Sequence, residues 1–323
     1  MAAVAVTAAV VAGAVAWTGR GEEGSAPAAQ GGPREGAPPL ALDALVEDPA
    51  QATALQSAAE LYESDRRRAA LDAFNKVLDS DPDSLYAGVG AALSLWPDGT
   101  LAQLRALEAT APQSGLVQLH LGLALLWEGR QREAEEAWRR AEEVDPDSPA
   151  AVRAESLLHP DFPAGRPFFV PAQSLPQDLA TLLPAAQLAE LKERAEGSSS
   201  LREWIDYGVA LQRAGKALSA RAAFDRAAEI EPDDPEALVA SAVVRFDKDD
   251  PSEAFSRLGP LAERFPDAAV VRFHLGLCLL WLSRVEDARN QLELAVSAAD
   301  GGVWSREASQ VLARLDEAAA QGG

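Results

Sequence analysis

The side chains that could act as metal ligands, nucleophiles or acid–base groups are few in this sequence and lie far apart. Its three histidines, His120, His159 and His274, are widely separated along the chain, whereas zinc ligands recur at short, defined spacings. The sequence has no HExxH helix, no GxSxG turn and no glycine-rich phosphate-binding loop. We therefore expect no catalytic residue, no metal site and no cofactor, and we predict that the protein is not an enzyme.

The remaining reactive groups have a structural interpretation. Cys278 lies in an apolar helical segment, which predicts a buried and unreactive thiol. The acidic tracts Glu229–Glu236 and Asp247–Asp250 fall where turns are expected, so their carboxylates should be solvated. His120 and His274 occupy matching places in two similar segments, which favours structural roles for both.

The charge balance excludes two classes of partner. The chain has 323 residues and a formal net charge of −21, from 29 basic and 50 acidic residues. Nucleic acids and anionic membrane surfaces select clusters of Lys and Arg. We expect neither a nucleic-acid partner nor adsorption to an anionic membrane surface, and we interpret the charge as a solvated surface.

One stretch, Leu201–Asp234, shows how the helices should be arranged. Seven marker residues occupy positions 4, 8, 11, 20, 24, 27 and 32 of this unit: Trp204, Gly208, Leu211, Ala220, Phe224, Ala227 and Pro232. Small residues such as Gly208 and Ala220 let two helices approach closely, and Pro232 ends the second helix because it lacks an amide donor. The spacing predicts a pair of packed helices.

These residues resemble the tetratricopeptide (TPR) repeat, a helical hairpin of about 34 residues. The resemblance implies an all-α solenoid. Similar units can be placed at residues 51–84, 85–114 (shortened), 115–148, 235–268 and 269–302. Cap helices are expected near Pro149–Leu158 and Val303–Ala320.

The repeats form two similar sets. Phe74 and Phe224 are 150 residues apart, and Trp127 and Trp281 are 154 apart, a change that matches the shortened second repeat. His120–Trp127 and His274–Trp281 are near copies. We infer two duplicated three-repeat modules with cap helices. The fifth repeat departs from the pattern, because Arg245 replaces an expected Tyr.

The sequence divides into five segments. Residues 1–18 are an apolar segment, 19–39 a flexible Gly/Ala/Pro spacer, 40–158 the first module, 159–184 a proline-rich linker and 185–323 the second module with its cap helix. Within the linker we expect a short helix near Gln177–Leu183 and Phe168–Val170 packed against a module. The apolar segment fits a membrane anchor, a cleaved signal or a mis-assigned start; it lacks a basic n-region and is short for a bilayer.

The expected binding surface is the concave side lined by the first helix of each repeat. In the third repeat, this side carries Leu116, Leu119, Leu123, Leu126 and Trp127. In the sixth, it carries Val270, Phe273, Leu277, Leu280 and Trp281. Both sets are apolar, which predicts a groove for an apolar or amphipathic segment of a protein, for example a helix. The alternative is that each set packs against its own cap helix or the other module.

The function predicted from these features is a scaffold for protein–protein interaction. The anchor, spacer and repeat order resembles that of anchored bacterial TPR proteins, which implies a cell-membrane protein with its repeats outside the cytoplasm and a role in envelope assembly. The alternatives are an exported protein and a soluble cytoplasmic regulator.

Overall fold

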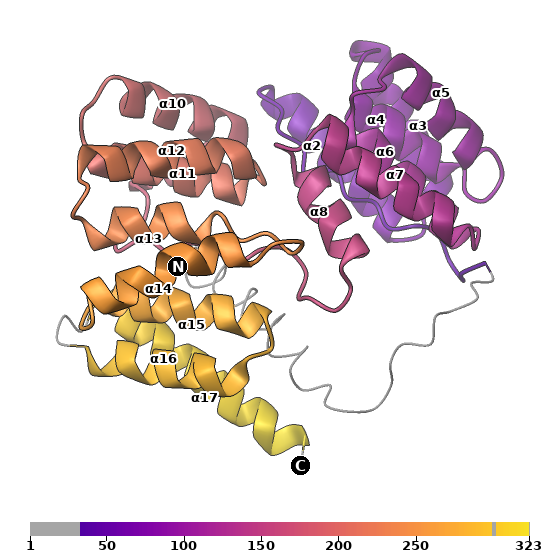
Figure 1. Ribbon diagram of the computed structural model, residues 1–323. Coiled ribbons are helices and arrows are strands. Elements are labelled where there is room, and N and C mark those ends of the chain that lie inside the picture. Colours follow the sequence, from indigo (N-terminus) through magenta and orange to yellow (C-terminus); the bar gives the residue numbers. More distant parts are fainter. Residues whose placement is uncertain (1–32, 299–301, 323) are drawn as a thin grey trace. The chain divides into compact units, whose positions relative to one another are not determined.

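The computed structural model describes residues 33–298 and 302–322, and within these ranges every regular element is a helix (Figure 1). Consecutive helices pack against each other in pairs. The predicted all-α, TPR-type fold is therefore confirmed. The chain forms two compact units. The first runs to Leu158 and the second starts at His159, except that Leu183–Ala186 is assigned to the first.

The first unit contains three helix pairs and a further helix. The helices are α2 (Pro49–Glu63), α3 (Arg67–Ser80), α4 (Leu85–Ser94), α5 (Thr100–Thr110), α6 (Gly115–Trp127), α7 (Gln131–Val144) and α8 (Pro149–Leu158). α2 packs on α3, α4 on α5 and α6 on α7, and α8 contacts both α6 and α7. The first helices of successive pairs also touch, so α2, α4 and α6 lie next to one another.

The second unit has the same order of paired helices after two additional ones. It contains α9 (Gln177–Ala180), α10 (Pro184–Glu196), α11 (Leu201–Arg213), α12 (Ala217–Ile230), α13 (Pro235–Val243), α14 (Ser252–Arg264), α15 (Ala269–Trp281), α16 (Val285–Ser297) and α17 (Val303–Gly322). The pairs are α11 with α12, α13 with α14 and α15 with α16, and α17 contacts α15 and α16.

Small residues let the paired helices approach. A Cβ added at Gly208 would lie 2.5 Å from a ring carbon of Phe224, and one added at Gly122 would lie 2.3 Å from the indole nitrogen of Trp138. Local signals start the helices. The Ser114 hydroxyl accepts a hydrogen bond from an amide in the first turn of α6, and the Asp234 carboxylate does the same for α13. The hairpins thus follow from side chains visible in the sequence.

Helix positions repeat at the spacings seen in the sequence. α12 begins and ends 150 residues after α3, and α15 begins and ends 154 residues after α6. The duplication is an inference from these spacings. It makes residues separated by these distances structurally equivalent.

Two segment boundaries differ from those expected. Folded contacts begin before Leu40, because Arg34 and Pro38 are already hydrogen-bonded to the first unit. The segment 159–182, expected as a linker, belongs to the second unit. Sequence composition suggested a spacer and a linker because both segments lack helical periodicity. Of the expected spacer only residues 33–39 are described, and these are tied to the first unit through the backbone of Arg34 and Pro38.

The proposed anchor, residues 1–18, lies outside the described residues. Among the helices that the structure describes, none is both long enough and apolar enough to cross a membrane.

Candidate functional site

The ten residues predicted to line a groove are covered. On α15, Val270, Phe273, Leu277, Leu280 and Trp281 are all buried. On α6, Leu119 and Leu123 are buried, and Leu116, Leu126 and Trp127 are half-buried against the core. The two caps contribute to this packing, since α8 touches α6 and α17 touches α15. Binding of a partner by these residues remains a prediction, and a partner would have to reach a side of the helices that is already occupied.

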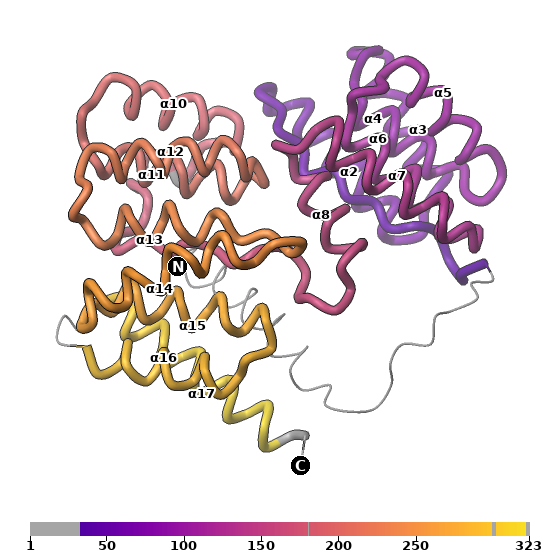
Figure 2. Tube along the Cα trace, in the orientation of Figure 1, coloured from indigo at the N-terminus to yellow at the C-terminus, as the bar shows by residue number. Residues whose placement is uncertain are grey.

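Non-helical chain from the same unit also packs on each of these cores. We define the N-terminal strap as residues 34–46 and the C-terminal strap as residues 162–174; neither contains helix or strand. Figure 2 traces the N-terminal strap in indigo across the first unit. The N-terminal face is defined as the side of α2, α4 and α6 that contacts the N-terminal strap, and the C-terminal face as the side of α11, α13 and α15 that contacts the C-terminal strap.

Three side chains of the N-terminal face bind the backbone of its strap, one from each helix. The Tyr62 hydroxyl of α2 donates to the Pro38 carbonyl at 2.6 Å. The amide of Ala41 donates to Nε2 of His120 at 3.1 Å. The strap's Leu45 amide donates to the Tyr86 hydroxyl of α4 at 3.3 Å.

The ends and side chains of the N-terminal strap add further contacts. Arg34 donates its amide to the Trp127 carbonyl at 2.8 Å, and its guanidinium lies 5.1 Å from the centre of that ring. Asp43 accepts two hydrogen bonds from Arg153 of α8, at 2.6 and 3.0 Å. Apolar strap residues pack on the core without being fully buried: Ala37, Leu40, Leu42, Ala44 and Val46.

The C-terminal face binds its strap in the same way. The Gln212 amide of α11 both accepts from the Phe169 amide, at 3.0 Å, and donates to its carbonyl, at 3.2 Å. The amide of the next residue, Val170, donates to Nε2 of His274 at 2.9 Å. The Ala172 amide then donates to Oε1 of Glu236 on α13 at 2.8 Å, and burial raises the pKa of this carboxyl although the amide bond acts against it.

Phe169 joins the C-terminal strap to the core. Its side chain is 2% exposed, stacks on the ring of His274 with centroids 5.0 Å apart, and meets Phe224 edge-on at 5.4 Å. Such ring contacts stabilise beyond the burial of area alone. The expected packing of Phe168–Val170 against a module is thus found for Phe169, which is part of the core of the second unit, and for Val170, which packs on that core.

Additional donors hold the C-terminal strap along its length. The indole of Trp304 in α17 donates to the Val170 carbonyl at 2.8 Å. Lys248 donates to the Pro163 carbonyl at 2.9 Å. Arg202 donates to two further strap carbonyls, those of Gln173 and Ser174.

Both face histidines act as hydrogen-bond acceptors for a strap amide. Nδ1 of His120 lies 2.8 Å from the Leu116 carbonyl, and Nδ1 of His274 lies 2.7 Å from the Val270 carbonyl. A carbonyl can only accept, so Nδ1 carries the proton and Nε2 is free to accept from the strap. Burial lowers the pKa of both histidines to about 4, which keeps them neutral at pH 7.

The six strap-binding side chains form three equivalent pairs. Tyr62 and Gln212, and likewise Tyr86 and Glu236, are 150 residues apart; His120 and His274 are 154 apart. Each strap meets its three partners in the same order along the chain. The two faces therefore bind different strap sequences through the same helix positions, mainly by their backbones.

Sequence reasoning identified the histidine pair but missed the other two pairs. His120 and His274 are identical residues at matching positions, which is a visible signal. The Tyr62/Gln212 and Tyr86/Glu236 pairs differ in residue type, and they share only the capacity to hydrogen-bond a backbone group. These pairs could have been found only from their matching positions in the repeat, where each is a polar residue on a first helix.

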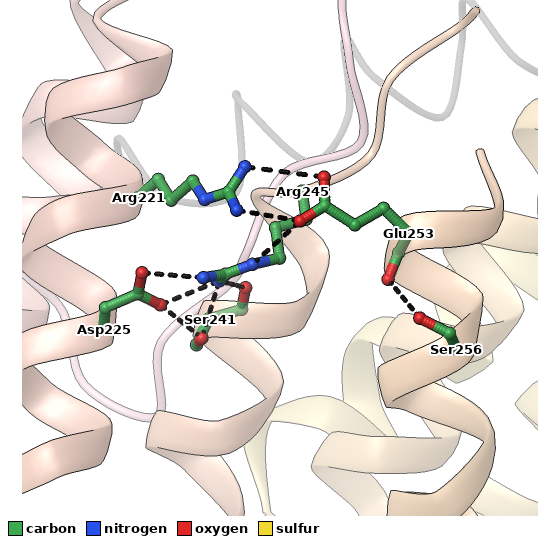
Figure 3. A network of polar contacts seen from close by, with 6 residues as sticks. All are labelled: Arg221, Asp225, Ser241, Arg245, Glu253 and Ser256. Atoms are coloured by element: carbon green, nitrogen blue, oxygen red, sulfur yellow. Dashed lines mark hydrogen bonds and ion pairs between the residues drawn. The ribbon is translucent and has the colours of Figure 1, made fainter. Parts of the chain in front are cut away.

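A second polar cluster lies away from the strap, in the second unit (Figure 3). Arg245, 7% exposed, forms an ion pair with Asp225 at 2.7 Å and another with Glu253, Nε to Oε1, at 3.3 Å. Glu253 also pairs with Arg221 at 2.8 Å. Burial alone would raise the pKa of Asp225, but hydrogen bonds from Arg245 and Ser241 hold it below the usual value.

This cluster has a structural role. Its residues come from α12, α14 and the end of α13, and Arg245 also donates to the carbonyl and hydroxyl oxygens of Ser241. The guanidinium fills the place where the repeat pattern expects Tyr, and its charge is matched by carboxylates on both neighbouring helices. Arg245, the irregular residue of the fifth repeat, therefore links α12 to α14.

The structure also shows the surroundings of the remaining residues that could act as nucleophiles, acid–base groups or metal ligands. Cys278 is buried, and burial raises the pKa of its thiol to about 12, so a thiolate does not form at neutral pH. His159 lies 3.1 Å from Asp249. Among the described residues, no group of three or more His, Cys, Asp or Glu side chains could hold a metal ion.

Comparison with known proteins gives distant similarity only. No family model matches the sequence, and no curated protein matches it. Solved structures that resemble the chain include yeast Tom70, with 13% identity and a TM-score of 0.35, covering 95% of this chain and 54% of that one. A tetratricopeptide repeat protein from Parabacteroides merdae has 10% identity and a TM-score of 0.34, covering 83% and 99% of the two chains.

Human IFIT1, solved as a dimer with m7Gppp-AAAA, shares 16% identity and has a TM-score of 0.33; the match covers 77% of this chain and 59% of IFIT1. This chain thus spans less than two thirds of the IFIT1 length. With scores of this size, assignment of the fold rests on the helix pairs and their spacing. On that basis the described chain is built from TPR-type helical hairpins.

Proposed function

We propose that this protein is a non-enzymatic scaffold that binds segments of other proteins on the faces formed by the first helices of its repeats. The observation that carries the proposal is that both faces already bind a non-helical segment through its backbone amides and carbonyls. Hydrogen bonds to a backbone depend little on the side chains of the bound segment, and apolar contacts add affinity. This mode differs from the helix-in-groove binding expected from the apolar strip.

The apolar character of the ten predicted face residues supports the same proposal. Leu126 and Trp127 are half-buried beside the N-terminal strap, so part of this apolar surface is close to solvent. A bound protein segment would cover it, together with Leu116, Leu119 and Leu123. On α15 the corresponding set (Val270, Phe273, Leu277, Leu280 and Trp281) is buried in the core of the second unit.

We further propose that residues 1–18 tether the scaffold to a bacterial cell membrane, with the repeats outside the cytoplasm, where it would serve envelope protein assembly. Support comes from the apolar run and from the Gly/Pro-rich residues after it. Membrane fractionation of the full-length protein tests this part. Full-length protein in the soluble fraction would exclude the tether and leave a soluble regulator as the alternative.

Site-specific photo-cross-linking tests the binding face. A photoreactive residue in place of Leu126, on the N-terminal face, should cross-link a partner protein in the source cells. The matched control replaces Arg140, an exposed residue on α7. Cross-links from position 140 with none from position 126 would mean that partners bind the second helices, which contradicts the proposal.

A further inference from the structure

The two straps are held to different extents, and this difference has a functional consequence. In the C-terminal strap, Pro163, Pro167 and Phe169 are buried, whereas in the N-terminal strap only Pro38 is buried. The apolar side chains of the N-terminal strap rest on the core as partly buried residues. Phe169, in contrast, is a member of the core itself.

Release of the N-terminal strap would leave a well-formed site. The face would keep Tyr62, Tyr86 and His120, each with the atom that binds a backbone group. Because His120 and Tyr86 accept from strap amides and Tyr62 donates to a strap carbonyl, the site is complementary to both kinds of backbone group. The helices of the first unit are held by their own contacts, with a core that includes buried residues such as Phe74 and Trp138.

The strap's side chains indicate what kind of segment fits. Six of the seven residues from Leu40 to Val46 are apolar, and Leu40, Leu42, Ala44 and Val46 pack on the core. Asp43 lies between them and pairs with Arg153, the charged side chain of α8 that reaches the strap. A matching segment is non-helical and apolar, and carries a carboxylate opposite Arg153.

We propose that the N-terminal strap is a displaceable built-in ligand, and that a non-helical, apolar segment of a partner protein with one carboxylate replaces it on the N-terminal face. This inference rests on the proposed function and assigns it a site and a ligand class. The strap competes as a tethered segment at high effective concentration, so partner binding is weak until the strap is displaced. The C-terminal strap stays in place as part of its core.

A labelled synthetic peptide with the sequence of residues 33–46 tests the exchange against the full-length protein, by fluorescence anisotropy. In Ala41→Pro the protein's own strap loses the amide that donates to His120, while the face is unchanged. The peptide should bind this variant at least about tenfold more tightly than it binds the unmodified protein. A peptide with Pro in place of Ala41 should not bind either protein.

Charge reversal provides a second route if Ala41→Pro disturbs folding. Asp43→Arg opposes Arg153 and weakens the strap, so peptide binding should tighten about threefold. The double variant Asp43→Arg/Arg153→Asp restores the pair within the protein and places a carboxylate opposite the peptide's own Asp, so binding should return to the unmodified level or below. Unfolding followed by circular dichroism establishes that each variant is folded.

The proposal is overturned if the peptide binds folded strap variants no more tightly than the unmodified protein. It is also overturned if the peptide with Pro in place of Ala41 binds as tightly as the unmodified peptide, because the Ala41 amide would then not hold the segment on the face. Either result would leave the scaffold function standing, since cross-linking from position 126 tests that function independently of strap exchange.

Discussion

The two straps of this protein differ in what holds them, although the same three helix positions bind both. The N-terminal strap is fixed by backbone hydrogen bonds, partly buried apolar side chains and one exposed ion pair with Arg153. The C-terminal strap adds the fully buried Phe169 and donors from Arg202, Lys248 and Trp304. The same helix positions can thus bind the backbone of a removable segment in one unit and of a permanent core segment in the other.

The difference between the straps also indicates how much their hydrogen bonds contribute to stability. A backbone hydrogen bond adds little net stability because the same groups bond to water when released. Burial of an aromatic side chain stabilises by several times as much. The C-terminal strap should therefore be the more stable of the two because it buries Phe169, whereas the histidine contacts are shared by both units and do not distinguish them.

The largest effect is expected from removing the buried aromatic. Phe169→Ala should lower the free energy of unfolding of the second unit by about 3–5 kcal/mol, because it leaves a cavity between His274 and Phe224. The matched change in the other strap, Leu42→Ala, should cost only about 1 kcal/mol because Leu42 is partly exposed. Urea denaturation followed by circular dichroism measures both. Equal costs would contradict the distinction between the straps.

The histidines should make both units sensitive to acid. Their pKa values of about 4 lie below the ordinary 6.5, so the neutral form favours the folded state. This stabilisation is complete above pH 6.5 and is lost as the pH falls from 6.5 to about 4, amounting to roughly 3 kcal/mol for each histidine. Protonation of Nε2 also removes the acceptor for the strap amide.

His120→Gln and His274→Gln test this contribution, since glutamine does not titrate. Carboxylates that protonate near pH 4 affect variant and unmodified protein alike, so the difference in acid sensitivity isolates the histidine. Each variant should lose less stability between pH 7 and pH 4 than the unmodified protein. If acid destabilises the variants by the same amount, the histidines are not the acceptors described.

Smaller effects are expected at the other shared positions. Gln212→Ala removes two hydrogen bonds to Phe169 and should cost about 1–3 kcal/mol. Tyr62→Phe removes one bond, to the carbonyl of Pro38, and should cost about 0.5–1.5 kcal/mol. Thermal unfolding monitored by circular dichroism is sufficient for the comparison. A greater loss from Tyr62→Phe would show that the N-terminal strap depends more strongly on its hydrogen bonds than its partial burial suggests.

The helices could be predicted from the sequence because their determinants are local. Glycine opposite a bulky ring, as at Gly208 and Phe224, and proline after the second helix recur at fixed spacing. Apart from the packing of Phe168–Val170 against a module, the straps could not be predicted. Their contacts are made by backbone groups, which are the same in every residue, and their apolar residues do not follow a helical period. Irregular segments therefore appeared in the sequence as a spacer and a linker.

The candidate site was predicted in part for the same reason. The ten apolar face residues and the histidine pair have a sequence signature. The structure places the two histidines against the straps and the ten apolar residues in or against the cores of the two units. What covers these residues depends on Tyr62, Tyr86, Gln212 and Glu236, whose residue types differ between the two units. Only a structure shows that unlike side chains at equivalent positions make equivalent contacts.

Hydrogen exchange at the amides of Ala41 and Val170, measured by NMR on the full-length protein, tests the central claim most directly. Each amide donates to a face histidine, so both should exchange more slowly than in an unfolded chain. The Ala41 amide should exchange at least about tenfold faster than that of Val170, because its strap opens more easily. Lack of protection at either amide would contradict backbone recognition by the faces, and equal protection would contradict the difference between the straps.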